Sequence, residues 1–321
     1  MANVGPFNPA SRAVPYTPTP TNWGPDHNHP CPCGSTKLVG NCHVNRAKGN
    51  WKLPQYTPPL TGPCTGISCP GCYASFTNDC SPELSSEHWL SKGIILEVGT
   101  NGRVTVSGLL SPLGQERVVQ VSEFADHILC ERHNNALNKL DATAIEVFRT
   151  LDHYQKDQAS QPDPHGSEFD LFSGERLERW MLKLLWGGIA AGAFSATEIR
   201  SGVDQNMLAD YLFRNQKLPE GWGFGMTFHS GVGIGVRAEA PIGVTTGVGP
   251  DGTLWKIAVS MGAVSFGFGL GNQKAKHGFN FHLRPQAVIL KSRLDTAEKT
   301  LALAWDHKKL GRPLDYNYQG T

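Results

Sequence analysis

Apolar residues recur with helical spacing in two stretches of the chain. The first begins at Asn134, and its apolar positions are Leu137, Leu140, Ile145, Phe148 and Leu151. The second follows Ser173, a residue type that caps helices, and its inner face carries Leu177, Trp180, Met181, Leu184 and Leu185. Positions three and four residues apart share one side of a helix, so both stretches are predicted to be amphipathic helices.

Short runs of β-branched and aromatic residues predict strands elsewhere. Residues 103–106 and 117–121 flank a Gly/Pro turn region at 108–114, as the two arms of a hairpin would. Beyond Pro219 the predicted strands are separated by Gly and Asp-Gly turns and cover 224–228, 232–238, 254–259, 264–268, 279–283 and 288–290. This texture indicates an antiparallel meander packed by the Trp180 helix, followed by a last helix over 296–305. The expected fold class is therefore α+β.

The chain has 321 residues, enough for two domains with a sizeable core each. Residues 1–30 are rich in Pro, Asn and Thr and are expected to form a disordered arm. A compact cysteine cluster at 31–44 is followed by a predicted linker at 45–63. We expect one domain over 64–154, a polar linker over 155–166, and a second α+β domain of unknown role over 167–321.

Charge and hydropathy narrow the expected partners and location. The net charge is +1, so nucleic-acid binding would need a local basic patch. Such patches occur at 35–52, which contains Lys37, Arg46, Lys48 and Lys52 without an acid, and at 274–293, although both could be ordinary solvated charge. The most apolar segment, 180–194, is broken by Gly and too short to span a membrane. The opening residues lack an apolar export signal, so we expect a cytoplasmic protein whose cysteines bind zinc.

The cysteine cluster at 31–44 has the composition of a small zinc knuckle. Its potential ligands are Cys31, Cys33, Cys42 and His43. Three thiolates and an imidazole can close a tetrahedron around Zn²⁺, and metal binding would supply the folding energy of so small a unit. The pattern C-x-C-G-S … C-H resembles the SEC-C zinc motif. That resemblance implies a structural zinc and a role in binding a protein partner.

A second set of ligands is spread over two distant pairs. Cys69 and Cys72 form a C-x2-C pair, and Cys130 and His133 form a second pair with the same spacing. Four protein ligands leave no open position, so this zinc is expected to be structural rather than catalytic. Cys64 and Cys80 remain; both could be spare thiols, or either could replace one of the four.

The second set alternates with a Glu-His doublet in an order that resembles the HNH (ββα-metal) endonucleases. The matching segments are Ser85-Ser86-Glu87-His88 and Cys130 through Asn135, within residues 65–155. His133 stands where the family usually has a Cys, and Lys92-Gly93 stands where a Pro often follows the doublet. The resemblance implies a zinc-stapled ββα-metal core that hydrolyses phosphodiester bonds with Mg²⁺ or Mn²⁺.

Roles for individual residues follow from that resemblance. His88 would be the general base, because an imidazole titrates near neutrality, and Glu87 would bind the catalytic Mg²⁺ or Mn²⁺. Asn134 would orient His88 or bind the metal, and Asn138, on the same helical face, could be a further ligand. With both cysteine clusters filled, we expect two structural zinc ions per chain.

Three functions are compatible with these features. The first is a bacterial or phage nuclease acting on DNA, whose role in antiviral defence rests only on analogy. The second is a zinc-binding adaptor that retains the nuclease fold but binds nucleic acid or protein without catalysis. The third makes the C-terminal half a ligand sensor that gates the nuclease, because its Gly-rich stretches at 231–235 and 262–271 permit close backbone approach. Tight turns are a simpler explanation of these glycines.

Overall fold

The computed structural model describes residues 28, 37–42, 44–45, 50–51, 60, 62–108, 116–159, 168–194, 205–214, 216–228, 242–248, 254–261, 264–271, 280–291, 298–305 and 314–317. These residues form a mixed α+β fold with a seven-stranded sheet, a four-stranded sheet and two two-stranded sheets. The expected α+β class is confirmed at that level. The disordered arm expected at 1–30 and the strand expected at 232–238 lie almost wholly outside the described residues.

The seven-stranded sheet joins both halves of the chain. Its order is β12 (Asn280–Leu283), β8 (Gly223–Phe228), β11 (Val264–Gly269), β10 (Leu254–Met261), β9 (Ile242–Val248), β4 (Arg103–Gly108) and β5 (Arg117–Gln120). Neighbouring strands run antiparallel except β4 and β9, which pair in parallel with Val106 opposite Ile242. The predicted hairpin of 103–106 and 117–121 is confirmed as β4 and β5, but it continues the C-terminal sheet.

The four-stranded sheet has the order β15 (Leu314–Asn317), β13 (Ala287–Lys291), β14 (Glu298–Ala304) and β7 (Glu168–Ser173). The helix predicted over 296–305 is wrong, because Glu298–Ala304 is the strand β14. β13 pairs with it antiparallel on one side and β7 pairs with it in parallel on the other. A central strand buried on both faces has a nearly continuous apolar run, which periodicity does not separate from a buried helix.

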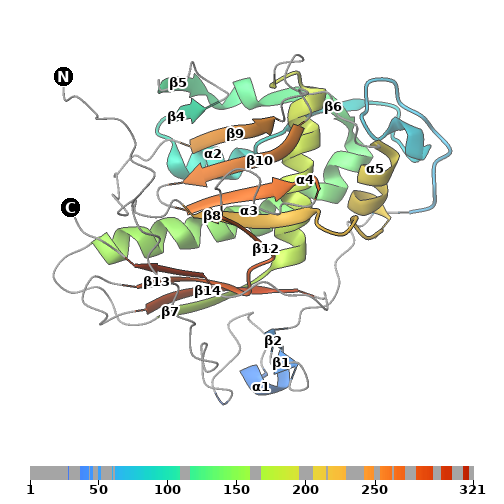
Figure 1. Cartoon of the computed structure of the whole chain (residues 1–321). Coiled ribbons are helices and arrows are strands. Elements are labelled where there is room, and N and C mark those ends of the chain that lie inside the picture. The colour runs from blue at the N-terminus through green and yellow to red at the C-terminus, as the bar shows by residue number, and fades with distance from the viewer. Residues whose placement is uncertain are drawn as a thin grey trace.

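The long helix α3 (Glu131–Ala159) lies between the two large sheets, and α4 (Gly174–Ala190) crosses it (Figure 1). Phe148 of α3 contacts both α4 and the seven-stranded sheet, with ring centroids 5.6 Å from Trp180 and 5.4 Å from Phe266. The predicted cap of α4 is confirmed, since the Ser173 side chain accepts a hydrogen bond from the Arg176 backbone at 3.3 Å. Shorter helices are α1 (Val39–Cys42), α2 (Lys92–Val98) and α5 (Gln205–Phe213).

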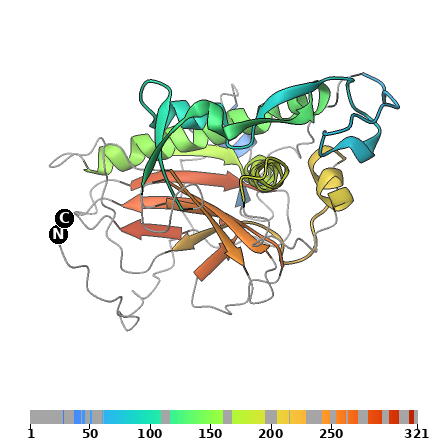
Figure 2. The ribbon, with the colours of Figure 1, turned by 90° about the horizontal axis from the view of Figure 1, so that it is seen from above.

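A separate two-stranded hairpin precedes α3 directly. β3 (Leu84–His88) pairs antiparallel with β6 (Ala125–Cys130), with Leu84 opposite Cys130 and His88 opposite Ala125. Residues 89–124 between the two strands contain α2, β4, β5 and the short helix η2 (Val121–Phe124). In the view from above, these segments and α3 lie along one side of the molecule (Figure 2). β3, β6 and α3 therefore form a strand–strand–helix unit whose first strand carries Glu87 and His88. We call this the hairpin–helix unit.

The domain boundary expected near residue 154 does not separate two bodies in the structure. α3 continues to Ala159, and Gln155 and Asp157, both assigned to the predicted linker, are buried. One continuous hydrophobic core includes residues from Cys69 to Trp305. Residues 64–154 and 167–321 thus share a sheet and a core, because β4 pairs with β9 and α3 packs on both sheets. No described helix is both long enough and apolar enough to cross a membrane.

Candidate metal centre and the adjoining charged cluster

Four potential zinc ligands converge at the start of α3. Cys72 lies in the loop after residue 62, Cys80 precedes β3, Cys130 ends β6, and His133 lies in the first turn of α3. Their ligand atoms all lie within 4.8 Å of one another, and all four residues are buried. The hairpin–helix junction therefore brings together residues that are distant in sequence.

The spacing of these atoms suits a tetrahedral zinc ion. His133 Nδ1 lies 3.1 Å from the sulfur of Cys130, 3.7 Å from that of Cys80 and 3.8 Å from that of Cys72. Zinc–ligand bonds of ~2.3 Å to sulfur and ~2.05 Å to nitrogen at the tetrahedral angle place sulfur and nitrogen ~3.6 Å apart. Three thiolates and one imidazole form a closed set, so a zinc ion held here would stabilise the fold and leave no position for water.

The remaining ring nitrogen of His133 has a partner that sets its orientation. Nε2 lies 3.2 Å from Thr77 Oγ1, and that hydroxyl donates its proton to the Ala74 carbonyl at 2.7 Å. The hydroxyl oxygen is thus left to accept from Nε2–H, which directs the lone pair of Nδ1 at the three sulfurs. Burial lowers the pKa of His133 to about 4, so the ring is neutral near pH 7. Neutral imidazole is the form that binds zinc.

The three thiols differ in their ease of ionisation. Burial opposes ionisation of Cys130, yet hydrogen bonds from the His133 backbone and from Ser81 lower the pKa of Cys130 below its ordinary value. Burial raises the pKa of Cys72 and that of Cys80, despite hydrogen bonds from backbone groups. Zinc binding at these two sulfurs must therefore displace their protons.

The ligand set differs from the sequence expectation at one position. Cys80, which the sequence left as an alternative, takes the place expected for Cys69. The Cys69 side chain is buried but donates to the Pro82 carbonyl at 3.4 Å, while its backbone N–H bonds the sulfur of Cys80. The tight turn from Cys69 to Cys72 therefore contributes one thiol and one backbone donor to the cluster rather than two thiols. Cys64 is exposed and lies outside it.

An ion pair ties the cysteine-containing loop to α3. Arg132 Nε lies 2.9 Å from Asp79 Oδ1, and its Nη2 donates to Asp79 Oδ2 at 3.1 Å. Burial acts to raise the pKa of Asp79, but the hydrogen bond with Arg132 outweighs this effect and lowers that pKa below its ordinary value. Asp79 also accepts from the Thr65 backbone at 3.0 Å. These contacts connect the residues that flank Cys80 and His133.

Glu87 belongs to a buried charged cluster rather than to an open cleft. Its Oε1 lies 2.5 Å from Lys183 Nζ of α4, an ion pair rather than a well-directed hydrogen bond. The same ammonium lies 2.7 and 2.8 Å from the two carboxylate oxygens of Asp141 and 3.3 Å from the His88 carbonyl. Glu87 is therefore not free to bind a metal ion as the family resemblance implied. Lys183 had no motif in the sequence that marked it as part of a site.

The other predicted catalytic residues, Asn134, His88 and Asn138, are half-buried or exposed. Asn134 Nδ2 donates to Ser85 Oγ at 3.0 Å and to the Ser86 carbonyl at 3.5 Å, which fixes the start of α3 against β3. His88 is half-buried, and Asn138 is exposed one helical turn beyond Asn134. Burial, with the charges of Lys92 and Lys183, lowers the pKa of His88 below its ordinary value. The structure thus holds Asn134 beside the strand that carries His88, without a bond between the two side chains.

The first cysteine cluster is only partly described. Cys31, Cys33 and His43 lie outside the described residues, and Cys42 is half-buried at the end of α1. The SEC-C-like knuckle therefore stays a prediction.

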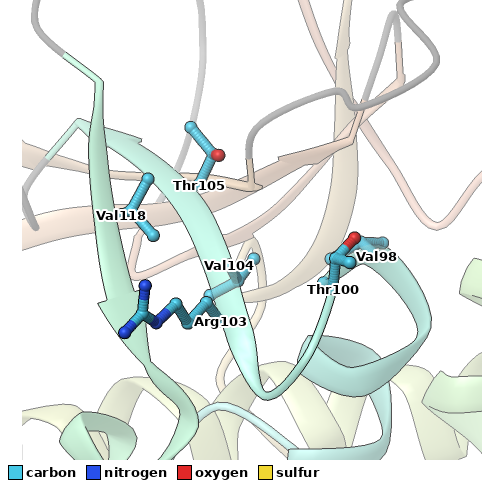
Figure 3. A pocket seen from close by; sticks show the side chains of 7 residues that line it. Val98, Thr100, Arg103, Val104, Thr105 and Val118 are labelled. Atoms are coloured by element: carbon cyan, nitrogen blue, oxygen red, sulfur yellow. The ribbon is translucent and has the colours of Figure 1, made fainter.

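A pocket of about 210 Å³ lies between the end of α2 and the β4–β5 hairpin, lined by Val98, Arg103 and Val118 among others (Figure 3). None of the candidate catalytic or metal-binding residues lines this pocket.

No family model, curated protein or solved structure matches the chain.

Proposed function

We propose that this protein is a nuclease that hydrolyses phosphodiester bonds on an HNH-like, zinc-stapled hairpin–helix unit, with DNA as the expected substrate. The observation that carries the proposal is the bond from Asn134 to β3, two and three residues before His88. It holds a potential general base and a potential amide ligand on one rigid unit. A zinc ion held by the Cys72/Cys80/Cys130/His133 cluster would anchor the start of α3 in the same unit.

His88 has the properties required of the base. It is half-buried rather than enclosed, and its lowered pKa keeps the imidazole neutral at pH 7. In the proposed step it removes a proton from water, the resulting hydroxide attacks phosphorus, and the P–O bond to the leaving oxygen breaks. That oxygen then takes a proton from solvent. General-base catalysis near pH 7 needs an imidazole that is neutral and held in position, so that it can accept the proton.

The residues suited to a catalytic Mg²⁺ or Mn²⁺ are fewer than the resemblance implied. Glu87 does not fit the role, because Lys183 is paired with it. The side-chain nitrogen of Asn134 donates its hydrogen bonds to β3, and its Oδ1 accepts no hydrogen bond from the described residues. Asn138, one helical turn further along α3, is exposed. Amide oxygens, water and a substrate phosphate are ligands that such ions accept. A bound divalent ion would stabilise charge on the phosphate and on the leaving oxygen.

The test is cleavage of plasmid and single-stranded DNA in the presence of Mg²⁺ or Mn²⁺. We expect cleavage by the wild type and its loss in His88→Ala. His127→Ala is the matched control, because His127 is an exposed histidine on β6 of the same hairpin and should be dispensable. Equal behaviour of the wild type and His88→Ala on both substrates would contradict the nuclease proposal.

One observation favours a second function, that of a non-catalytic adaptor. The Lys183 ammonium already neutralises the acid that would hold the catalytic metal in the family. An adaptor of this kind would bind nucleic acid or a protein partner and keep the zinc cluster only for its fold. Retention of labelled DNA without cleavage in a fluorescence anisotropy assay, unchanged by His88→Ala, would support this function instead.

A further inference from the structure

A cage of oxygen atoms surrounds the ammonium of Lys183. The cage consists of one carboxylate oxygen of Glu87, both carboxylate oxygens of Asp141 and the backbone carbonyl of His88. The side chains of Lys183 and Glu87 are 1% and 4% exposed, and that of Asp141 is 20% exposed. Three elements contribute to it: Glu87 and His88 come from β3, Asp141 from α3, and Lys183 from α4.

The dimensions of this cage are close to those of a divalent-cation site. Lys183 Nζ lies 2.5 Å from Glu87 and 2.7 and 2.8 Å from Asp141. Ca²⁺ binds oxygen at about 2.3–2.6 Å and Mg²⁺ at about 2.0–2.1 Å. A metal ion that bridged the two carboxylates would have to lie within about 3 Å of the ammonium nitrogen, where two positive charges repel strongly. The amine and a metal ion therefore exclude each other.

We propose that the Lys183 side chain is the resident cation of the Glu87–Asp141 carboxylate pair, in the position that a divalent ion would otherwise take between them. The protein then binds no Mg²⁺ or Mn²⁺ at Glu87 while α4 is docked against α3. Removal of the ammonium opens a divalent-cation site at the same oxygens.

Charge balance in the buried cluster supports this assignment. Burial raises the pKa of Glu87 above its ordinary value, and attraction to the Lys183 ammonium opposes that rise. Burial favours the neutral amine of Lys183, but attraction to Asp141 and Glu87 outweighs it and raises the pKa of Lys183 above its ordinary value. The lysine therefore stays charged and in place at neutral pH. The pKa of the buried Tyr73 hydroxyl is raised by burial and by the charge of Glu87, so this neighbour stays neutral.

The cage is also held in shape by groups outside it. Ser91 Oγ donates to Asp141 Oδ1, and Trp180 Nε1 donates to Ser91 Oγ at 2.7 Å. Trp180 lies on α4, three residues before Lys183. Asp141 therefore keeps its orientation by contacts that do not involve the ammonium. A variant without the amine should retain the oxygen positions that a metal ion needs.

The experiment measures thermal unfolding of the full-length, zinc-loaded protein as Mn²⁺ is added, without DNA. Mn²⁺ is a suitable probe because it is the weakest competitor of zinc for thiolate ligands in the divalent series. The variants are wild type, Glu87→Gln, Lys183→Met and the double variant Lys183→Met/Glu87→Gln. Methionine keeps the length of the lysine stem without its charge.

We expect wild type and Glu87→Gln to respond equally to Mn²⁺. Lys183→Met should have a lower Tm than wild type, since it leaves two carboxylates without a counter-ion, and added Mn²⁺ should restore part of the loss. The double variant should lose that Mn²⁺ response. Stabilisation of wild type that Glu87→Gln abolishes, or a folded Lys183→Met protein without a Mn²⁺ response, would overturn the proposal.

Should Lys183→Met fail to fold, the wild type and Glu87→Gln still decide the question. An equal Mn²⁺ response supports the lysine as resident cation, and a response that requires Glu87 contradicts it. The measurement needs no cleavage activity, so it stands whether or not the protein proves to be a nuclease. A metal ion bound only by Asn134 and Asn138 would affect both proteins alike.

Discussion

Replacing Cys80 with Ser separates the structural ligand set from the one that sequence spacing suggests. Cys80 is fully buried, and its sulfur lies 3.7 Å from His133 Nδ1. The variant leaves Cys72, Cys130 and His133 as the remaining ligands. Loss of an outer-shell partner alone costs ~10–100-fold in metal affinity, and a lost ligand should cost more. We therefore expect zinc affinity to fall by more than ~100-fold, or more than ~2.7 kcal/mol.

Cys69→Ser is the matched control, because Cys69 is also buried and only three residues from Cys72. Its thiol donates to the Pro82 carbonyl at 3.4 Å, and a serine hydroxyl can donate to the same oxygen. Exchange of one neutral hydrogen bond for another should change stability by less than ~1 kcal/mol. The two serine variants should therefore differ sharply although each removes one buried thiol.

The assay is elemental analysis of zinc combined with competition by a coloured chelator. Cys33→Ser serves as the background, so that only the cluster around His133 is counted. In that background we expect one zinc per chain in the parent and in Cys69→Ser, and rapid loss of it from Cys80→Ser. Zinc loss from Cys69→Ser with retention in Cys80→Ser would refute the assignment of Cys80 as a ligand.

Two further predictions concern the base and the shared core. In the wild type, burial and the charges of Lys92 and Lys183 lower the pKa of His88. Lys92→Ala removes one of these charges and should raise that pKa toward its ordinary value of about 6.5. An NMR titration of His88 at low salt measures the change in pKa directly. Since the neutral ring is the proposed base, the acidic limb of any cleavage profile should move to higher pH by the same amount. A fragment of residues 64–159 should not fold cooperatively, because β4 loses β9 and the carboxylates lose Lys183; a sharp unfolding transition of the fragment by circular dichroism would contradict this.

The sequence predicted those features that depend on local periodicity. The helix α3 follows from the sequence because it buries one face, so that apolar residues recur every three or four positions. The apolar residues of α4 recur with the same spacing, although the structure buries that helix on nearly all sides, its polar residues Glu178, Arg179 and Lys183 included. The strands β8, β10 and β11 were found because their β-branched and aromatic runs end at Gly-rich turns. The sequence of β14 predicts a helix because both faces of this strand are buried, which removes the alternation that identifies a strand.

Features that depend on distant contacts were not visible in the sequence. The C-x2-C spacing of Cys69 and Cys72 is that of a zinc knuckle, but the loop presents a backbone N–H where a second thiol was expected. The pairing of β4 with β9 joins segments far apart in the chain, and no local pattern encodes it. Lys183 lies in an apolar helix, where only the acids contributed by β3 and α3 explain its burial.

The two buried clusters act on the same strand from opposite ends. Asn134, Asn138 and Asp141 share one face of α3, because residues four and seven positions apart align along a helix. His133 and Asp141 are eight residues apart, or ~12 Å at the rise of an α-helix. A metal ion in the Cys/His cluster would fix the first turn of α3 beside Ser85, and Lys183 fixes the Glu87–His88 end of β3 two turns later. Zinc removal should therefore loosen the Asn134 contact first, whereas loss of Lys183 should loosen the backbone of His88. The proposed base, His88, is held between these two anchors and should keep its position only when both halves of the chain are folded.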